Sequence, residues 1–436
     1  MAAKRKSAFD ISKCARPNIL ALEPYRCARD DYKDDGTNIL LDANENAYGP
    51  GLSLQSRDKI SGNSASGASD GSKIDLLGLN RYPDPDSHQE DLKSQLCRLR
   101  NYHVHTTQKL TPANLFVGVG SDEAIDALIR AFCRPGKDKI LTCPPTYGMY
   151  GVSAQVNDVE VVKVPLDTEN GFQLQPDLIN KTLAKDPSIK LVYVCSPGNP
   201  TANLVRKVDV QRILEHPSWN GIVILDEAYI DFAPDGTSLA EWVLEWPNLA
   251  VMQTLSKAFG LAGIRLGTAF TSPQVAALLN NLKAPYSISN PTSQLARAAL
   301  EEENLAVMRR NRDRILEQRE RLLKELPQIR GVGRFRGGRE SNFLLVEMLN
   351  PRGQPSNEVA LAVYERLAET RGVVVRFRGK ELGCLGCLRI TVGTSDEVSR
   401  FLIELKSVLE DVHEQTPQMN GQSEVAREES ANRVVA

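Results

Sequence analysis

Lys257 lies in the sequence TLSKAFGLAGIRLG, among small and apolar residues that would remove its amine from water. A desolvated lysine loses its proton more readily, and a neutral amine can form a Schiff base with an aldehyde. Ser256 and Arg265 lie close by in the sequence and supply a hydroxyl and a planar cation suited to a phosphate group. Spacing alone leaves a surface lysine after a strand as an equally good interpretation, so the neighbouring motifs have to decide.

Three further motifs with polar or anion-binding residues each follow an apolar run. They are GSDE at 120–123, SPGNPT at 196–201 and DEAY at 226–229. Because the ligand of an open parallel sheet lies beyond the carboxyl ends of the strands, these motifs and Lys257 predict one site built from several connections. Each motif is weak alone, since a Gly-Ser helix start, for example, is more often only a cap.

The residue types at these strand ends fit a phosphorylated pyridine ring. Asp226 ends the run IVILD, where a carboxylate needs a cation or a donor, and a protonated pyridine nitrogen would be such a partner. Tyr229 and Asn199 could donate hydrogen bonds to a phenolic oxygen, and Tyr147 could stack on the ring. Backbone amides at Gly120 and Ser121 could bind the phosphate at a helix start. The combination predicts pyridoxal 5'-phosphate (PLP) as the cofactor.

Short apolar runs alternate with helical patterns along the chain, which is typical of an α/β protein with a mostly parallel sheet. Strands are predicted at 115–119, 139–142, 191–195, 222–225 and 250–254, and helical spacing follows the first of them at 125–132. A charged helix from about 300 leads to further strands at 341–346, 373–376 and 388–392. The predicted division is an N-terminal arm and small-domain segment (1–80), a large PLP-binding domain (81–295), a small C-terminal domain (296–413) and a disordered tail (414–436). The Ser/Gly-rich stretch at 51–75 is predicted to be a flexible insertion.

Composition narrows the classes of function. The formal net charge of −2 gives no global attraction for nucleic acid or an anionic membrane, and no apolar run approaches the length of a membrane span. Eight cysteines show no disulfide framework, and the CLGC run at 384–387 lacks the further ligands of a zinc site, so no metal is expected. A reducing compartment, the cytoplasm, is the expectation. A mitochondrial presequence stays an open alternative, against which Asp10 and weak amphipathicity argue.

Six blocks together resemble one known family, histidinol-phosphate aminotransferase, over residues 38–412. They are NRYPDP at 80–85, CPPTYGMY at 143–150, SPGNPT at 196–201, DEAYIDF at 226–232, TLSKAFGLAGIRLG from 254 and LRITVGT at 388–394. The resemblance implies PLP fold type I: an α/β large domain with a mostly parallel, seven-stranded sheet flanked by helices, and a smaller α+β domain. It also implies a homodimer whose active sites borrow residues across the interface.

The resemblance also assigns roles to individual residues. It implies a catalytic group in which Lys257 is the Schiff-base lysine and proton carrier, Asp226 pairs with the pyridine nitrogen, and Tyr229 contacts the phenolic oxygen. The implied cofactor-binding set adds Ser121, Asp122, Tyr147, Asn199, Thr254, Ser256 and Arg265. The implied substrate-binding set is Tyr48, Tyr82, Arg376 and Arg389, with Tyr82 reaching into the neighbouring subunit. Arg378, two residues beyond Arg376, is the alternative to it.

The implied reaction belongs to histidine biosynthesis: transfer of an amino group between L-histidinol phosphate and 2-oxoglutarate, giving imidazole acetol phosphate and glutamate. Two departures from the family pattern, Ala202 where Gly is usual and Ala47 where Pro is common, remove no reactive group. The alternatives are a related PLP enzyme, such as an aromatic-amino-acid transaminase or a threonine-phosphate decarboxylase, and a non-catalytic protein of the same fold. The intact Lys257, Asp226 and Arg389 argue against the last.

Overall fold

A computed structural model describes residues 16–23, 31–32, 36–53, 80, 82–83 and 87–432. Most of the predicted insertion at 51–75 lies outside these residues. The strands are β1 (Ile39–Leu40), β2 (Leu115–Val119), β3 (Lys139–Thr142), β4 (Glu160–Lys163), β5 (Ile189–Cys195), β6 (Ile222–Asp226), β7 (Leu249–Thr254), β8 (Leu266–Thr271), β9 (Val332–Arg336), β10 (Phe343–Met348), β11 (Val373–Val374), β12 (Arg376–Phe377) and β13 (Cys387–Thr391). The α-helices are α2 (Pro17–Leu20), α4 (Ser87–Arg100), α5 (Gly120–Phe132), α6 (Met149–Val156), α7 (Pro176–Lys185), α8 (Lys207–Leu214), α9 (Pro273–Leu282), α10 (Asn290–Ala299), α11 (Glu302–Glu325), α12 (Asn357–Arg371) and α13 (Ser395–Asn432). The 3-10 turns are η3 (Pro112–Asn114), η4 (Ile230–Phe232), η5 (Ala240–Leu244), η6 (Ala262–Ile264) and η7 (Leu326–Gln328).

The large domain is built on a seven-stranded sheet in the order β2-β8-β7-β6-β5-β3-β4. Neighbouring strands from β7 to β4 pair in parallel, and β8 alone runs antiparallel to both of its neighbours, β2 and β7. The predicted mostly parallel, seven-stranded sheet is therefore confirmed. The carboxyl ends of β5, β6 and β7 meet at one edge, which is where a parallel sheet places its ligand.

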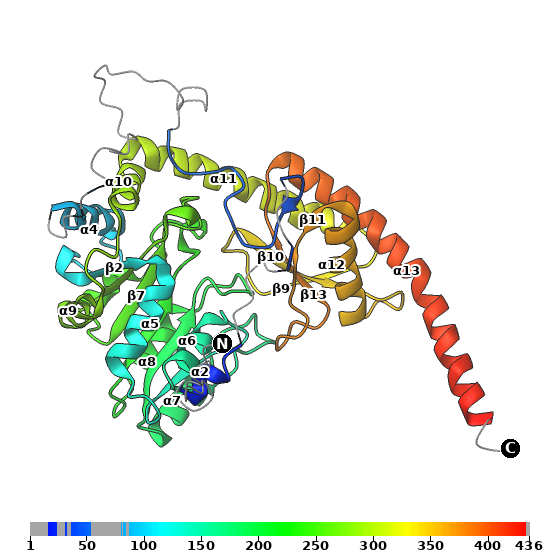
Figure 1. Cartoon of the computed structure of the whole chain (residues 1–436), viewed down its shortest axis with the longest axis horizontal. Helices are drawn as coiled ribbons and strands as arrows, with labels where there is room; N and C mark the ends of the chain where they lie inside the picture. The colour runs from blue at the N-terminus through cyan, green and yellow to red at the C-terminus, as the bar shows by residue number, and fades with distance from the viewer. Residues whose placement is uncertain are drawn as a thin grey trace, which may run out of the picture.

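Helices cover both faces of this sheet, as the buried runs of the strands require. Side chains of α5, α6 and α9 pack with alternate residues of the central strands in one apolar cluster. Side chains of α7 and α8 pack with the other alternate residues, in a cluster that continues into the small domain. Figure 1 shows the resulting layers of helix, sheet and helix. Burial of the sheet on both faces makes it the rigid base from which the loops at its edge project.

The small domain holds a four-stranded sheet in the order β12-β13-β10-β9, in which every pair is antiparallel. A separate two-stranded ladder joins β1 to β11 in parallel, pairing Ile39 with Val373. The N-terminal strand β1 thus belongs to the small domain although it precedes the whole large domain in the sequence. The residues that follow β1, from Leu41 onward, lead from the small sheet toward the edge of the large one.

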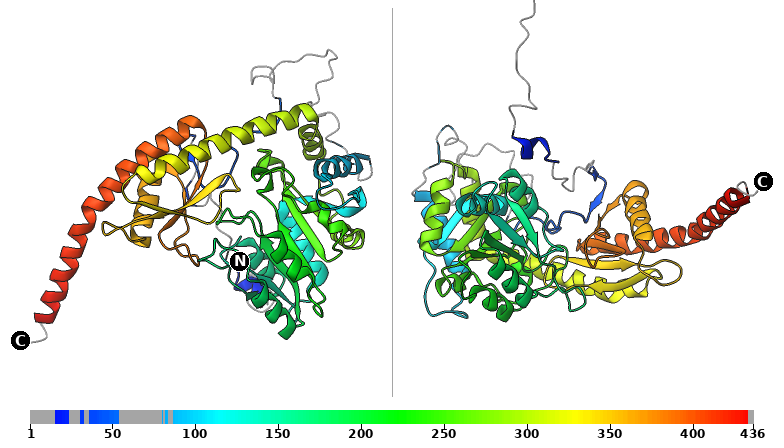
Figure 2. Two further views of the ribbon diagram at one scale, coloured as in Figure 1. Left: turned by 180° about the vertical axis from the view of Figure 1, so that it is seen from behind. Right: turned by 90° about the horizontal axis from the view of Figure 1, so that it is seen from below.

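Helix α11 connects the two domains, and Figures 1 and 2 show it running from the large domain along the small one. Helix α13 packs on α12 and α11 and then projects away from the rest of the chain. Helix α13 extends to Asn432, through most of the tail that the sequence predicts to be disordered.

Most predicted strands are confirmed, two of them with identical bounds, 115–119 and 139–142. The sequence reasoning missed β1, β4, β8 and β9. The first two residues of β8, Leu266 and Gly267, had been assigned to the lysine motif, which hid the start of the strand. Strand β9 carries two arginines in five residues, so it lacks the apolar run that marks a buried strand.

Candidate active site

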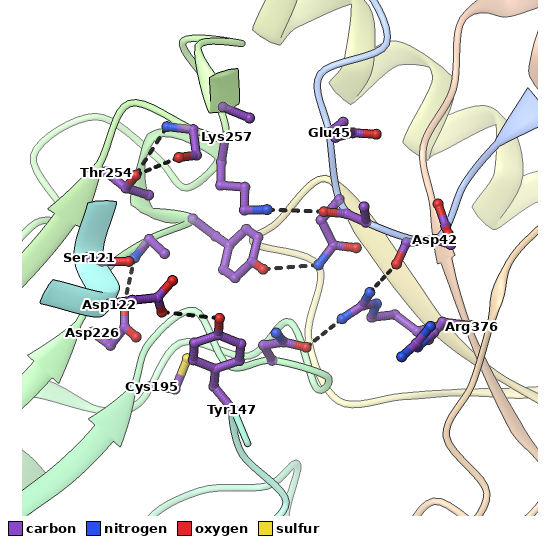
Figure 3. Close-up of a pocket in the computed structure, with 18 of the residues that line it drawn as sticks. Asp42, Glu45, Ser121, Asp122, Tyr147, Cys195, Asp226, Thr254, Lys257 and Arg376 are labelled. Carbon is purple, nitrogen blue, oxygen red and sulfur yellow. Dashed lines mark hydrogen bonds between the residues drawn. The ribbon is translucent and has the colours of Figure 1, made fainter. Parts of the chain in front are cut away.

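One cavity of about 290 Å³ lies between the carboxyl edge of the large sheet and the small domain. Its wall is formed by Asp42, Ala43, Asn44, Glu45, Ser121, Asp122, Tyr147, Cys195, Asn199, Asp226, Ala228, Tyr229, Thr254, Ser256, Lys257, Ala262, Arg265, Arg376, Arg378 and Arg389. All the residues predicted for catalysis and cofactor binding are among them. Figure 3 shows Lys257, Asp226, Asp122 and Arg376 converging on the same space from different elements.

Lys257 follows β7 and directs its amine into this cavity, where Nζ donates a hydrogen bond to the carbonyl oxygen of Ala43 at 3.0 Å. Burial, and then the positive charge of Arg389, lower the pKa of Lys257 to about 8. With this pKa roughly a tenth of the molecules carry a neutral amine at pH 7, and the neutral form is the nucleophile. The desolvation predicted from the sequence is present.

Asp226 ends β6 and is buried at the base of the cavity. Its Oδ2 accepts a hydrogen bond from the hydroxyl of Tyr150 at 2.6 Å, and its Oδ1 accepts from the backbone N–H of Ala228 at 3.1 Å. Burial raises the pKa of Asp226 to about 6 in spite of these two donors. The site is thus one in which a cationic ring nitrogen would strongly favour the carboxylate form.

An anion-binding cradle is formed where β2 turns into α5. Gly120 begins the helix with a φ of +72°, and a Cβ there would lie 2.6 Å from Nη2 of Arg265. The guanidinium group therefore packs directly against the start of the helix, at a position whose left-handed φ favours glycine. The backbone N–H of Ser256 donates to Oγ1 of Thr254 at 3.1 Å. The hydroxyl groups of Thr254 and Ser256 lie 2.9 Å apart. A cation, two hydroxyls and helix amides together suit a phosphate.

Tyr229 is buried and lines the same cavity. Its hydroxyl oxygen accepts a hydrogen bond from Nδ2 of Asn44 at 3.0 Å. Its ring contacts Phe343 edge-on, with centroids 5.1 Å apart. Burial raises the pKa of Tyr229 to about 12, so the phenol keeps its proton and can act as a donor.

Arg389, in β13, joins the two domains at the cavity wall and is 4% exposed. One end of its guanidinium donates to Oδ1 of Asn199 at 2.7 Å, and the other donates to the carbonyl oxygen of Asp42 at 2.5 Å. The predicted cofactor residue Asn199 and the predicted substrate residue Arg389 therefore contact each other directly. The sequence reasoning had not placed these two side chains together.

Arg376 and Arg378 both line the cavity, so the structure does not discard either alternative. Arg376 forms an ion pair with Asp31 at 2.5 Å, and Arg378 forms one with Glu381 at 2.9 Å. Only Arg376 is paired in register with Arg389 across the β12–β13 ladder. That register places Arg376 closer to Arg389 than Arg378 is along the sheet.

Tyr147 lines the cavity as predicted, and its hydroxyl donates to Oδ1 of Asp122 at 3.2 Å. Its ring lies edge-on to that of Tyr150, with centroids 5.7 Å apart. The hydrogen bond and the edge contact hold the ring in one orientation at the cavity wall, as a stacking platform requires.

Two predicted substrate residues do not line this cavity. Tyr48 packs instead beneath the guanidinium of Arg314 in α11, 3.9 Å from its ring centroid. Tyr82 is 79% exposed and stacks on Tyr286, with centroids 4.7 Å apart. In this chain the ring of Tyr48 is engaged by packing between the N-terminal segment and α11, so its assignment to substrate stays a prediction.

The described residues include no group of three or more His, Cys, Asp or Glu side chains placed to hold a metal ion. Cys384 and Cys387 are free and buried, and burial raises the pKa of the Cys384 thiol to about 12. Among the residues described, no helix is long and apolar enough to span a bilayer.

Sequence reasoning missed three residues that shape the site: Tyr150, Asn44 and Asp42. Tyr150 ends the CPPTYGMY block at 143–150, in which only the first tyrosine, Tyr147, was given a role. Asn44 and Asp42 lie in the DANENAYGP block, whose polar residues after an apolar pair were a signal that was not used.

Residues 38–405 match the family described as aminotransferase class I and II, and the chain belongs to this family. It is 51% identical to a histidinol-phosphate aminotransferase of Schizosaccharomyces pombe over 407 residues, covering 93% of this chain and 99% of the relative. It is 44% identical to the Saccharomyces cerevisiae histidinol-phosphate aminotransferase, covering 92% and 98%. Its fold matches the structure of the Sinorhizobium meliloti histidinol-phosphate aminotransferase in complex with PLP, with a TM-score of 0.74 at 22% identity, covering 93% of this chain and 99% of that one. The predicted fold type I is thereby confirmed.

Proposed function

We propose that this chain is a PLP-dependent histidinol-phosphate aminotransferase, a transferase of histidine biosynthesis. It moves an amino group between L-histidinol phosphate and 2-oxoglutarate, giving imidazole acetol phosphate and glutamate. The observation that carries the proposal is the identity of 44–51% to fungal histidinol-phosphate aminotransferases over nearly the whole chain. The cavity supports it, because a low-pKa lysine, a buried carboxylate and a buried arginine meet there.

The cavity fits PLP at three separate points. Asp226 is a buried carboxylate whose hydrogen-bond donors, Tyr150 and Ala228, are both neutral, which leaves room for a cationic partner. The cradle at Gly120 holds Arg265 where a side chain would otherwise be, which suits the phosphate group. Lys257 lies between these points and the small domain, with its amine in the cavity.

Each side chain has a distinct task toward this cofactor. We assign covalent attachment and proton transfer to the amine of Lys257, and pairing with the ring nitrogen to Asp226. The hydroxyl of Tyr229 and the amide of Asn199 bind the phenolic oxygen, and the ring of Tyr147 stacks on the cofactor. The phosphate-binding residues are Ser121, Asp122, Thr254, Ser256 and Arg265. When bound, PLP accepts the electron pair left by the substrate's α-proton, which Lys257 removes and returns.

The two substrates share anionic groups, a carboxylate in glutamate and a phosphate ester in histidinol phosphate. Planar guanidinium groups can bind either of them through two hydrogen bonds. We assign this task to Arg389 and Arg376. Arg389 is held by Asn199 and Asp42 and so is already oriented before substrate arrives.

We further propose a homodimer in which Tyr82 enters the partner's site. In this chain Tyr82 is exposed and lies outside its own cavity, which supports delivery to a second copy. Because Tyr286 stacks on Tyr82, the ring of Tyr286 would also lie next to the partner's site. We keep the domain boundaries expected from the sequence, near residues 80, 295 and 413. We also propose that the enzyme is cytoplasmic.

A half-reaction screen tests the proposed function directly. Purified protein loaded with PLP is mixed separately with glutamate, histidinol phosphate, phenylalanine and threonine phosphate, and conversion of the cofactor to its amine form is followed by absorbance. Rapid conversion by glutamate and histidinol phosphate is the expected result. Faster conversion by phenylalanine, or release of carbon dioxide from threonine phosphate, would replace the proposal with an aromatic transaminase or a decarboxylase.

A further inference from the structure

Asn44 occupies an unusual position in the short segment that crosses from the small domain to the cavity. It is 1% exposed and has a φ of +54°, in the left-handed region. Asn is among the few residues with a Cβ that adopt this conformation readily, so the position is suited to Asn, Asp or Gly. Its backbone carbonyl accepts a hydrogen bond from Nδ2 of Asn342 at 3.1 Å.

A hydrogen-bonded ring with Thr391 holds the side chain of Asn44 in one orientation. The backbone N–H of Asn44 donates to Oγ1 of Thr391 at 3.1 Å, and this hydroxyl donates to Oδ1 of Asn44 at 2.9 Å. With its oxygen engaged by Thr391, the amide turns its nitrogen toward the large domain. There Nδ2 meets the hydroxyl of Tyr229 at 3.0 Å.

This contact determines which way the Tyr229 hydroxyl donates. A phenol carries a single proton, and its oxygen here accepts from Asn44, so the proton is left for an acceptor inside the cavity. We propose that Asn44 is a positioning residue that makes Tyr229 a hydrogen-bond donor to the phenolic oxygen of the cofactor. The inference rests on the proposed function, because it takes PLP as the occupant of the cavity.

The charges around Tyr229 support the same direction of hydrogen-bond donation, from its hydroxyl into the cavity. Burial has the largest effect on the pKa of Tyr229 and raises it, while the nearby Arg389 and then the bond from Asn44 act to lower it. A donor behind the phenol makes its own proton a stronger donor toward the cavity. Because Thr391 belongs to the small domain and Tyr229 to the large one, the device operates only where the two domains are docked.

The test uses Asn44→Gly, which keeps the left-handed backbone and removes the donor. We expect PLP to leave this variant about tenfold faster than the wild-type protein, which corresponds to the loss of one hydrogen bond to a partly charged system. The pH at which the absorbance of the bound cofactor changes should rise by about one unit, because the deprotonated phenolic oxygen is less well stabilised. A purely structural role for Asn44 would not move this midpoint.

A double variant separates an action through Tyr229 from a direct one. In a Tyr229→Phe background, Asn44→Gly should change PLP release by less than twofold, since the group it acts through is absent. An undiminished tenfold effect in that background would overturn the proposal. So would an unchanged absorbance midpoint in Asn44→Gly alone.

Asn114→Gly is the matched control for lost stability, because Asn114 is also buried and donates through Nδ2, to the carbonyl oxygen of Thr271 at 3.0 Å, outside the cavity wall. It should leave the absorbance midpoint in place. Failure of the proposed function would look different: PLP would bind and respond to Asn44→Gly, yet histidinol phosphate would not convert it.

Discussion

Arg376 lies directly opposite Arg389 in the antiparallel ladder of β12 and β13, so the two guanidinium groups project from the same face of the small sheet. Like charges directly opposite each other are destabilising. Both side chains line the cavity, where the proposed function assigns them jointly to the anionic group of a substrate.

We expect Arg376→Lys to raise the KM for both histidinol phosphate and glutamate, by about tenfold, since lysine keeps the charge but loses the planar fork. Arg378→Lys is the matched control and should raise KM much less, because Arg378 lies two residue pairs further along the ladder from Arg389. Steady-state kinetics with each substrate measure the ranking. The reverse order would transfer the substrate role to Arg378.

Lys257→Ala should abolish amino transfer while the chain still folds, because one amine serves as nucleophile and proton carrier. In the wild-type protein, covalent attachment of added PLP should speed up as pH rises, with a midpoint near the lowered pKa of about 8. Borohydride reduction followed by peptide mass spectrometry locates the attachment.

Lys283→Ala is the control for this experiment. Burial also lowers the pKa of Lys283 to about 8, yet Lys283 does not line the cavity. The variant should keep its label on Lys257. A label on Lys283, or substantial turnover by purified Lys257→Ala, would contradict the assignment.

Asp226→Asn should lower turnover by several orders of magnitude, because the ring nitrogen loses its charged partner. The cofactor-free variant should nevertheless be at least as stable as the cofactor-free wild type at pH 8. The pKa of Asp226 is raised from 3.8 to about 6 in the folded chain, so the folded chain binds more protons than the unfolded chain in this window. Stability contributed by this group is therefore lost as pH rises from about 4 to about 6, by up to about 3 kcal/mol.

Urea unfolding of both cofactor-free proteins at pH 5 and pH 8 measures this difference. Relative to the wild type, the variant should have a higher free energy of unfolding at pH 8 than it has at pH 5. A gap that does not depend on pH would mean that Asp226 does not titrate in the folded chain as its burial requires.

Tyr82→Phe should weaken binding of the anionic substrate if its hydroxyl reaches the partner's site. Mixing this variant with Lys257→Ala creates hybrid dimers in which one site has both Lys257 and a partner's Tyr82. Substrate affinity should recover in that site, which is measured as activity at low substrate concentration. No recovery, with subunit exchange confirmed by mass spectrometry, would argue against the shared site.

The sequence was sufficient to locate Lys257, Asp226, Asn199 and Ser121, because all four follow strands of one parallel sheet and the topology of such sheets brings strand ends together. It was insufficient for Asn44, whose partner Thr391 is 347 residues away. No local pattern indicates a pairing at that separation. The position of Tyr48 could not be read from the sequence for a related reason, since its ring could pack on α11 or face the cavity, and the path of the chain between the domains decides which.

Burial explains two further features that the sequence did not reveal: the contact of Tyr150 with Asp226 and the left-handed conformation of Ala202. Tyr150 looked like a helix residue among others, yet its hydroxyl reaches Asp226 because α6 packs against the sheet at that point. Ala202, where the family has Gly, adopts a φ of +53° and is fully buried. A left-handed alanine costs about 1 kcal/mol, which burial of its methyl group offsets by about 0.8 kcal/mol, so the departure from the family pattern is tolerated.

The pairing of β1 with β11 sets the time at which a newly made chain becomes able to bind its cofactor. Ile39 cannot pair until Val373 has been synthesised, and Asp42 cannot bind Arg389 until that residue has been synthesised. Only then can the segment that follows β1 be held in place beside Lys257. During synthesis the seven-stranded sheet can be complete once residue 271 has left the ribosome, while the cavity above it still lacks a wall. A chain interrupted between residues 271 and 373 would therefore hold every strand of the large sheet, but neither the partner of β1 nor the arginine that contacts Asp42.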